Sequence, residues 1–394
     1  MTSRESIGVA LLGSTGSIGE QSLDVIRTAA GRFQVVALAA RRSAAKLAAQ
    51  AREFRPQVVA LVDDAEAGAL ARDLPAGCRL EVGPEAVTEL AAADGAEVVL
   101  NGITGSVGLA PTLRALEAGR RLALANKESL IVGGALVAER ARPGQIVPVD
   151  SEHSALAQCL RAGTPAEVAK LVITASGGPF RGWKSAQLAA VTPEQALAHP
   201  TWAMGPVITI NSATLMNKGQ EVIEAHLLFG VPFDHIEVVV HPQSIVHAMV
   251  EFSDGATVAQ LSRPDMRLPI GLALGWPERS EQPFGQLDWA QVTTLEFEPV
   301  DRATFPLLDL AIRAGCAGGA APAVLNAANE EAVAAFLTGR LPFPCIAEVV
   351  AEVLATDAPP DRLDLDAVLA AERSARRRAR TLVEDLLTTG RADE

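Results

Sequence analysis

The sequence predicts an α/β protein that begins with a doubly wound parallel sheet, continues into a central α/β domain and ends in a helical domain. Two observations predict the sheet. Short apolar runs alternate with helical patterns up to about residue 150, and a glycine-rich turn follows the first run. A third observation predicts the last domain, because the chain is Ala-rich with amphipathic helical patterns from about residue 313 onward.

The composition limits the size of the core and the kinds of partner. The chain has 394 residues, of which 49% are hydrophobic and 21% are charged, so it can build a large packed core in two or three domains. The formal net charge is −13 and there is no long basic run. This charge disfavours nucleic acid and anionic membrane surfaces as partners.

Cysteine usage and the N-terminus favour the cytoplasm. The four cysteines are scattered without a CxxC pair, which argues against a disulfide framework or a structural zinc site. The first apolar run is too short for a signal-peptide core, and no apolar run of about 18 residues occurs. We therefore expect a soluble, cytoplasmic protein.

Six apolar runs predict the parallel strands of an N-terminal domain over residues 1–149. They are IGVALLG, FQVVALAA, QVVALV, AEVVLN, RLALAN and QIVPV. The first run leads into Gly13-Ser-Thr-Gly16-Ser-Ile-Gly19 and then into the helical stretch EQSLDVIRTAA. Such a turn brings backbone amides to a pyrophosphate at the N-terminus of a helix, which indicates a Rossmann-like dinucleotide-binding domain. The alternative is an ordinary tight turn between strand and helix.

The end of the second predicted strand indicates which nucleotide is bound. NAD-binding proteins usually place a carboxylate there to hold the ribose 2′-hydroxyl. Here FQVVALAA is followed by Arg41, Arg42 and Ser43, and guanidinium groups suit a 2′-phosphate. The sequence therefore favours NADPH over NADH. The alternative is a solvated basic loop.

Lys127 and the segment IVPVDSEHS place charged side chains at the ends of two predicted strands, where each has more than one possible role. Lys127 follows a predicted strand, where it could contact cofactor or substrate, or pair with Glu128 or a surface carboxylate. Asp150 and Glu152 follow the last predicted strand. If the segment stays extended, both carboxylates point to one side and could bind one cation. The alternative is the capped start of a helix.

A second set of polar residues follows in the central domain. KLVITASGGPF predicts a strand that ends in an anion-binding turn at Ser176. Residues 181–206 look irregular, and a long loop with its own aromatic residue is often a lid. His199 and Trp202 would reach inward when this flap closes. For Trp202 the alternative is ordinary local packing.

The stretch ITINSATLMNKGQEVIE indicates a phosphate-binding site, called the phosphate grip below, where a loop passes into a helix. Ser212, Asn217 and Lys218 offer a hydroxyl, an amide and an ammonium group. Glu221 lies three residues after Lys218, hence on the same helical face. Together with the carboxylates of Asp150 and Glu152 it would supply hard oxygen ligands for Mg²⁺ or Mn²⁺.

These motifs resemble those of the 1-deoxy-D-xylulose 5-phosphate reductoisomerase family between about residue 7 and about residue 345. They are GSTGSIG, LANKESL, PVDSEHSA, TASGGPF, HPTWAMG, SATLMNKGQEVIEA, HPQSIVHAMVEF, PDMRLPI and LNAANEEAV. The resemblance implies a V-shaped homodimer that uses NADPH and a divalent cation, Mg²⁺, Mn²⁺ or Co²⁺. It also implies a phosphorylated ketose substrate and the reaction that forms 2-C-methyl-D-erythritol 4-phosphate in the non-mevalonate isoprenoid pathway.

The resemblance also implies roles for individual residues. It gives the metal ligands as Asp150, Glu152 and Glu221, and the catalytic group as these three with Lys127 and His199. The expected substrate-binding residues are Lys127, Ser151, Glu152, Ser176, His199, Trp202, Ser212, Asn217, Lys218 and Glu221. The expected cofactor-binding residues include those of the glycine-rich turn and the basic loop. They are Gly13, Thr15, Gly16, Ser17, Ile18, Arg41, Arg42, Ser43, Asn126, Glu128 and Gly205.

Two departures from the family pattern stand out. Relatives commonly carry Lys and Asp where this chain has Val207 and Asn211, and loss of both together indicates a deleted ion pair. The loop Arg41-Arg42-Ser43 replaces the family's usual Gly-Lys/Arg-Asn type, although its positive charge remains.

The sequence predicts three further segments after residue 149 and leaves two rival functions. We expect a catalytic metal- and substrate-binding domain over 150–285 with the flap loop 181–206, a connecting linker over 286–312, and a helical domain over 313–394. A metal-free NADP dehydrogenase is one rival and predicts activity that EDTA does not affect. A non-catalytic dinucleotide sensor is another, and it predicts NADPH binding without turnover.

Overall fold

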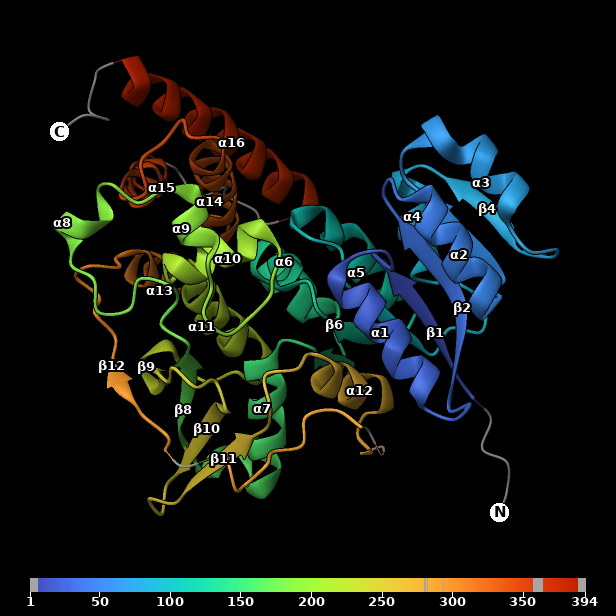
Figure 1. The fold of residues 1–394 in the computed structure, drawn as a ribbon, viewed down its shortest axis with the longest axis horizontal. Coiled ribbons are helices and arrows are strands. Elements are labelled where there is room, and N and C mark those ends of the chain that lie inside the picture. The colour runs from blue at the N-terminus through green and yellow to red at the C-terminus, as the bar shows by residue number, and fades with distance from the viewer. Residues whose placement is uncertain (1–5, 280, 282, 293, 357–363, 389–394) are drawn as a thin grey trace. The chain divides into compact units, whose positions relative to one another are not determined.

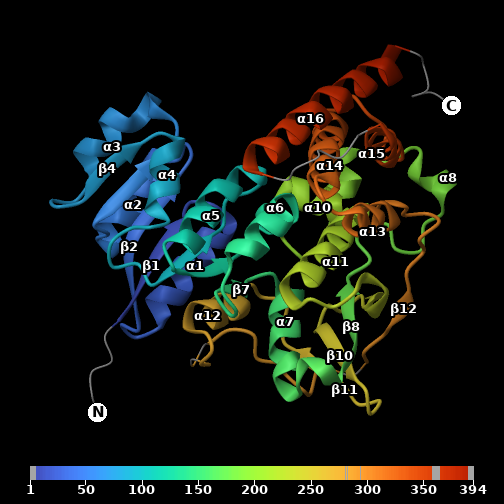
Figure 2. The same cartoon turned by 180° about the vertical axis from the view of Figure 1, so that it is seen from behind.

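The computed structural model describes residues 6–279, 281, 283–292, 294–356 and 364–388, which form two compact units (Figures 1 and 2). The first unit comprises the chain up to Ser129 together with Glu139–Ala157 and Asp265–Leu287. The second comprises Leu130–Ala138, Gln158–Pro264 and the chain from Asp288 onward. Each unit has its own sheet. The α/β class predicted from the sequence is confirmed.

A seven-stranded parallel sheet forms the centre of the first unit, in the order β4-β3-β2-β1-β5-β6-β7. Its strands are β1 (Ile7–Leu12), β2 (Phe33–Ala40), β3 (Val58–Leu61), β4 (Arg79–Val82), β5 (Val98–Asn101), β6 (Arg121–Leu124) and β7 (Ile146–Pro148). All six predicted strands are confirmed. The sequence analysis missed β4, because this short strand at the sheet edge is largely exposed and lacks an apolar run.

Helices on this sheet close the core of the first unit. They are α1 (Ser17–Thr28), α2 (Ala44–Phe54), α3 (Ala67–Asp73), α4 (Pro84–Leu90), α5 (Leu109–Glu117) and, from much later in the chain, α12 (Arg267–Gly275). The side chains of Ile270 and Leu274 in α12 are fully buried in the core that includes β1 and α1. Burying each contributes about 1.5–3 kcal/mol. Arg121 donates to the carbonyl oxygen of Leu274 at 2.9 Å, which fixes the end of α12.

The second unit contains a five-stranded mixed sheet in the order β11-β10-β8-β9-β12. Its strands are β8 (Val168–Ala175), β9 (Ile236–Val240), β10 (Val246–Phe252), β11 (Thr257–Leu261) and β12 (Glu298–Pro299). The predicted strand in KLVITA is β8, which lies at the centre and pairs with β10 in antiparallel and with β9 in parallel orientation. The turn that follows β8 therefore begins from a strand that is paired on both sides.

The helices of the second unit are α8 (Ser185–Leu188), α9 (Pro193–Leu197), α10 (Pro206–Ala213), α11 (Met216–Phe229), α13 (Leu307–Ala317), α14 (Ala321–Leu337), α15 (Cys345–Ala355) and α16 (Leu365–Thr388). The predicted C-terminal helices are present, and α13 begins inside the segment that lacked periodicity in the sequence. Figure 1 shows α14 beside α10, α15 and α16, and α14 also packs on α13. None of the described helices is long and apolar enough to cross a membrane.

Candidate active site

The glycine-rich turn lies where the strand order of the first sheet reverses, between the carboxyl ends of β1 and β5. Gly13 has φ 82°, and a Cβ atom there would lie 2.8 Å from the carbonyl oxygen of Gly102. A Cβ atom on Gly19 would lie 2.4 Å from the carbonyl oxygen of Ser14. Only glycine fits both positions, because α1 starts very close to the turn. Its first-turn amides then face the crevice where this fold binds dinucleotides.

The side chain of Gln50 in α2 holds this turn in place. Ser14 is fully buried and donates from Oγ to Gln50 Oε1 at 2.7 Å, while Gln50 Nε2 donates to the Ser14 carbonyl oxygen at 2.9 Å. Thr15, Gly16 and Ser17 follow, and the last two are exposed. The sequence analysis missed Gln50, because nothing in a helical glutamine indicates a partner 36 residues away.

The basic loop after β2 has a carboxylate partner from the next strand. Arg41, Arg42 and Ser43 are exposed. The Arg42 Nε atom lies 2.8 Å from Asp63 Oδ2, and Asp63 follows β3. The loop itself carries no carboxylate, as the sequence shows, and the acid that pairs with Arg42 comes from the end of the neighbouring strand. Asp63 orients Arg42, while the Arg42 side chain stays 70% exposed.

Asn126 ties two strand-end loops together in the first unit. Its buried side-chain amide donates to the carbonyl oxygens of Ile103 and, at 2.9 Å, Gly105. Its Oδ1 accepts from the backbone amide of Ser129 at 2.8 Å, and its amide lies 3.2 Å from Glu128 Oε2. The loop after β5 and the start of α6 (Lys127–Arg140) are thus held in one arrangement beside the crevice.

Lys127 and Asp150 form an ion pair, so Lys127 has a carboxylate partner directly before α7 (Ser151–Cys159). The Asp150 carbonyl oxygen accepts from the Ser154 amide at 2.8 Å. The extended geometry considered for Asp150 and Glu152 is therefore wrong, because a helix begins here. Glu152 lies in the first turn of this helix and accepts a hydrogen bond from Ser151 Oγ.

The electrostatics of Asp150 keep its carboxyl group ionised. Burial opposes ionisation, but the positive charges of Lys127 and His153 and the hydrogen bonds outweigh it and hold the pKa of Asp150 well below its usual range. An ionised carboxylate is a ligand that a hard cation prefers.

In the second unit, Ser176 in the turn after β8 contacts the side chain of His199. The Ser176 Oγ atom lies 3.0 Å from His199 Nε2 and accepts from the Gly178 amide at 3.2 Å. The backbone amides of Thr201 and Trp202 donate to His199 Nδ1 at 3.1 and 2.9 Å. Because Nδ1 accepts both bonds, the proton of the neutral ring lies on Nε2. Burial lowers the pKa of His199, which favours that neutral form.

The predicted phosphate grip is built from two helices, and the expectation of a loop entering a helix is wrong. Ser212 lies in α10, and α11 starts after Leu215, whose φ of 61° turns the chain sharply. The turn after β8 packs directly on this junction, since a Cβ atom on Gly178 would lie 3.0 Å from the Ser212 carbonyl oxygen. Ser176 and Ser212 are thus brought close to one another.

The first turn of α11 surrounds the carboxylate of Glu221. Asn217 Nδ2 donates to Glu221 Oε1 at 2.6 Å, and Lys218 Nζ donates to Oε2 at 2.5 Å. The side chains of Lys218 and Glu221 are only 5% and 1% exposed. The prediction that these two residues share a helical face is confirmed. Asn217, Lys218 and Glu221 therefore form one hydrogen-bonded cluster, in which Lys218 and Glu221 are buried.

The segment over 181–206 is not irregular throughout, because it contains the short helices α8 and α9. Thr192 accepts a cap hydrogen bond from the Gln195 amide, and Pro193 occupies the first helical position. Residues 198–205 lack regular structure, and the exposed Gly205 then begins α10. The ring centroid of Trp202 lies 6.2 Å from that of His247 in an edge-to-face arrangement.

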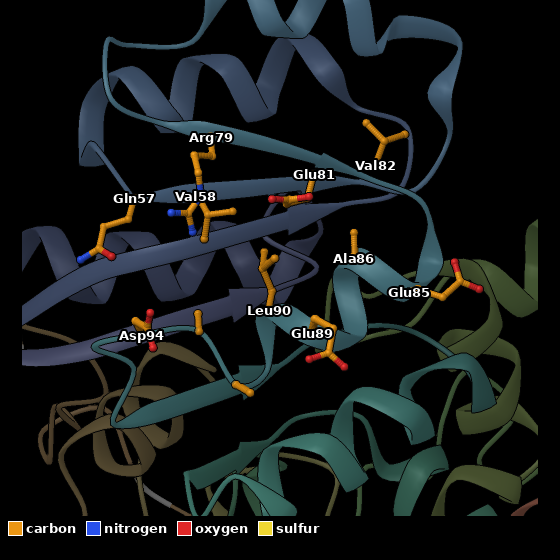
Figure 3. A pocket seen from close by; sticks show the side chains of 12 residues that line it. Gln57, Val58, Arg79, Glu81, Val82, Glu85, Ala86, Glu89, Leu90 and Asp94 are labelled. Carbon is orange, nitrogen blue, oxygen red and sulfur yellow. The ribbon is translucent and has the colours of Figure 1, made fainter.

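A separate pocket of 540 Å³ lies in the first unit among β3, β4 and α4 (Figure 3). Its polar side chains are those of six exposed residues, Gln57, Arg79, Glu81, Glu85, Glu89 and Asp94. None of the residues predicted for the active site lines it. We therefore assign this pocket no part in the candidate site.

Comparison with known proteins identifies the family. The family model of 1-deoxy-D-xylulose 5-phosphate reductoisomerase matches residues 9–134, and models of its C-terminal domains match 146–229 and 261–378. The enzyme of that name from Beutenbergia cavernae is 62% identical over 384 residues, covering 96% of this chain and 97% of the relative. That from Kitasatospora griseola is 60% identical over 385 residues, covering 95% and 99%.

Solved structures agree with these sequences. The 1-deoxy-D-xylulose 5-phosphate reductoisomerase of Zymomonas mobilis in complex with NADPH is 42% identical, with a TM-score of 0.90 and coverage of 96% of this chain and 99% of that one. A DOX-P reductoisomerase in complex with NADPH, fosmidomycin and magnesium is 37% identical, with a TM-score of 0.90 and coverage of 97% and 99%. The chain belongs to the 1-deoxy-D-xylulose 5-phosphate reductoisomerase family.

Proposed function

We propose that the chain converts 1-deoxy-D-xylulose 5-phosphate into 2-C-methyl-D-erythritol 4-phosphate. The observation that carries this proposal is the 62% identity to a reductoisomerase across 96% of the chain. The chain is an oxidoreductase that uses NADPH and a divalent cation, as the complexes of its structural neighbours with NADPH and magnesium support. The reaction first rearranges the carbon skeleton by breaking one carbon–carbon bond and forming another. Hydride from NADPH then reduces the resulting branched aldehyde to an alcohol.

For the cofactor, the proposed binding residues are those of the glycine-rich turn and the basic loop. The close approach of α1 to the turn, which requires glycine at Gly13 and Gly19, supports binding of the pyrophosphate by first-turn amides. The exposed guanidinium of Arg42, oriented by Asp63, supports binding of the 2′-phosphate. Arg41 and Ser43 lie beside Arg42 in the sequence and would complete this contact.

For the cation, the proposed ligands are Asp150, Glu152 and Glu221. Their oxygen atoms suit Mg²⁺, and Mn²⁺ or Co²⁺ would be accepted by the same residues. The ionised state of Asp150 and the carboxylate oxygens of all three residues support this assignment. When bound, the cation would polarise the substrate carbonyl as a Lewis acid. Lys127 and Ser151 would then lie close enough to orient the substrate.

For the substrate phosphate, the proposed grip is Ser176, Ser212, Asn217 and Lys218. Two observations support it. The turn after β8 packs on Ser212, and Asn217 and Lys218 both donate to Glu221, which holds them side by side. His199, neutral with its proton on Nε2, donates to Ser176 and leaves that hydroxyl proton available to a phosphate oxygen.

Trp202 would cover the bound substrate and exclude water. We further propose that the chain forms a homodimer and acts in the cytoplasm, as its resemblance to the family implies.

The test is the oxidation of NADPH in the presence of 1-deoxy-D-xylulose 5-phosphate, followed by absorbance. We expect turnover with Mg²⁺, none with EDTA, and a loss of more than about 100-fold in Glu152→Gln without a change in NADPH affinity. Glu85→Gln, an exposed carboxylate of the separate pocket, is the matched control and should keep full activity. Turnover in EDTA would instead favour a metal-free dehydrogenase. NADPH binding without turnover would favour a dinucleotide sensor.

A further inference from the structure

Helix α14 buries two asparagine side chains one helical turn apart in the motif LNAANEEAV. Asn326 and Asn329 are both 0% exposed. Burying an amide is unfavourable unless it is hydrogen-bonded, and an apolar residue would fill the same space at lower cost. Their partners are therefore informative, since a polar contact in a helix interface fixes one arrangement of the helices.

Asn329 contacts the helix that carries Ser212. Its Nδ2 donates to Oδ1 of Asn211 at 2.9 Å, and Asn211 is itself buried in α10. Because Ser212 follows Asn211 directly, a rotation or slide of α10 that moves Ser212 also displaces Asn211 and disturbs this hydrogen bond.

Asn326 contacts the helix that carries Asn217, Lys218 and Glu221. Its Oδ1 accepts from Nε2 of Gln220 at 3.0 Å, and Gln220 is buried in α11 directly before Glu221. The other end of the Asn326 amide donates to Glu330 Oε1 at 2.9 Å. Both ends of the amide are thus used, so the orientation of Asn326 is fixed.

The chain of contacts continues from Asn326 to the C-terminal helix. Arg376 of α16 donates from Nη2 to Glu330 Oε2 at 2.5 Å and to Glu372 Oε1 at 2.6 Å. The carboxylate of Glu330 is therefore held from both sides, by α14 itself and by α16. In this way α16 stabilises the rotamer through which Asn326 engages Gln220.

We propose that Asn326 and Asn329 are positioning residues, which fix α10 and α11 relative to one another so that Ser212 and Lys218 converge on one phosphate group. The inference rests on the proposed function, because the ligand of this grip is the phosphate of the substrate. The residues act through Asn211 and Gln220 and do not touch the substrate themselves. A purely stabilising role would instead need only the filling of space between the helices.

The test compares stability with substrate affinity in variants of the first pair. Asn329→Leu leaves the Asn211 amide buried with a lost partner, while Asn211→Leu combined with Asn329→Leu replaces both polar groups by apolar ones of similar shape. Val333→Ala, a buried apolar residue of the same helix, is the matched control for a loss of packing. Stability is measured by urea unfolding. The Kd for 1-deoxy-D-xylulose 5-phosphate is measured by calorimetry with Mg²⁺ and without NADPH, and kcat/KM is measured with NADPH.

We expect Asn329→Leu to be less stable and to bind substrate about 10-fold more weakly. The double variant should regain most of the stability, but its Kd and kcat/KM should stay about 10-fold worse than those of the wild type. Val333→Ala should lose stability with no change in Kd. Gln220→Met combined with Asn326→Leu tests the second pair in the same way, if the first does not fold.

Recovery of substrate affinity together with stability in the double variants would overturn the inference, and so would an equal loss of affinity in Val333→Ala. The proposed function has a separate readout in the wild-type protein. Wild-type protein that neither binds nor turns over the substrate would overturn the proposed function and this inference with it. Wild-type turnover with unaffected double variants would overturn this inference alone.

Discussion

The Nε2 atom of His199 lies 3.0 Å from the Oγ atom of Ser176, while the Nδ1 atom of the same ring accepts from the backbone amides of Thr201 and Trp202. One imidazole therefore connects the turn after β8 with the irregular part of the flap. The connection depends on the protonation state of the ring, because a protonated Nδ1 atom cannot accept a hydrogen bond.

This dependence predicts how stability varies with pH. Burial lowers the pKa of His199, so between its folded pKa and the ordinary value of about 6.5 the unfolded chain binds the proton more readily. The contribution of His199 is thus complete above about pH 6.5 and is lost as the pH falls below it. We expect the wild type to lose more stability than His199→Gln between about pH 7 and about pH 5, measured by urea unfolding. The exposed His235→Gln variant is the control and should behave like the wild type. Parallel curves for His199→Gln and the wild type would contradict the assignment.

The buried ion pair of Lys218 and Glu221 predicts an asymmetry between single and double variants. Both side chains are at most 5% exposed. Lys218→Met should cost about 3 kcal/mol in the free energy of unfolding, because it leaves a carboxylate buried without its cation. Adding Glu221→Leu should restore most of that loss. The partly exposed pair of Lys170 and Glu237 is the control, and Lys170→Met should cost less than about 1 kcal/mol. A double variant less stable than Lys218→Met would show that the unpaired carboxylate of Glu221 does not cause the loss of stability in Lys218→Met.

The packing of α1 against the glycine-rich turn predicts a defect in NADPH binding. In Gly19→Ala the new methyl group would lie 2.4 Å from the carbonyl oxygen of Ser14, so helix and turn must separate. We expect a loss of about 2 kcal/mol in stability and weaker NADPH binding, measured by calorimetry. Gly68→Ala in α3 is the control, because nothing lies within 4 Å of its new Cβ atom. It should gain about 0.5–1 kcal/mol and bind NADPH normally. Unchanged NADPH affinity in Gly19→Ala would contradict the proposed role of the turn.

Much of the fold could be predicted from the sequence, for a physical reason. Parallel strands covered on both faces appear as continuous apolar runs, and β1, β2 and β5 are of this kind. The edge strand β4 and the helices α8 and α9 could not be predicted in this way. The first is exposed, and helices of four and five residues are too short to show a period.

The candidate site shows a similar division between residue types and partners. The motif predicted that Lys218 and Glu221 lie on one helical face, and the structure places them there, while their role in the chemistry stays a prediction. Partners distant in the sequence remained hidden, as with Lys127 and Asp150 or with Asn211 and Asn329. Such pairs depend on how helices and loops pack, which local patterns do not encode.

The departure from the family at Val207 and Asn211 leads to a last prediction. The two positions lie four residues apart in α10, so side chains there meet on one face of the helix. Asn211 is buried and accepts from Asn329, whereas Val207 is partly exposed.

Asn211→Asp alone would bury a carboxylate without a cation, at a cost of about 3 kcal/mol in the free energy of unfolding. Adding Val207→Lys supplies an ammonium group one turn away and should restore part of that stability. Val207→Lys alone is the control, and it should change stability by less than about 1 kcal/mol because its stem can reach solvent. Urea unfolding of the three variants measures these differences. Equal losses in Asn211→Asp and in the double variant would mean that Val207 and Asn211 do not replace a former ion pair.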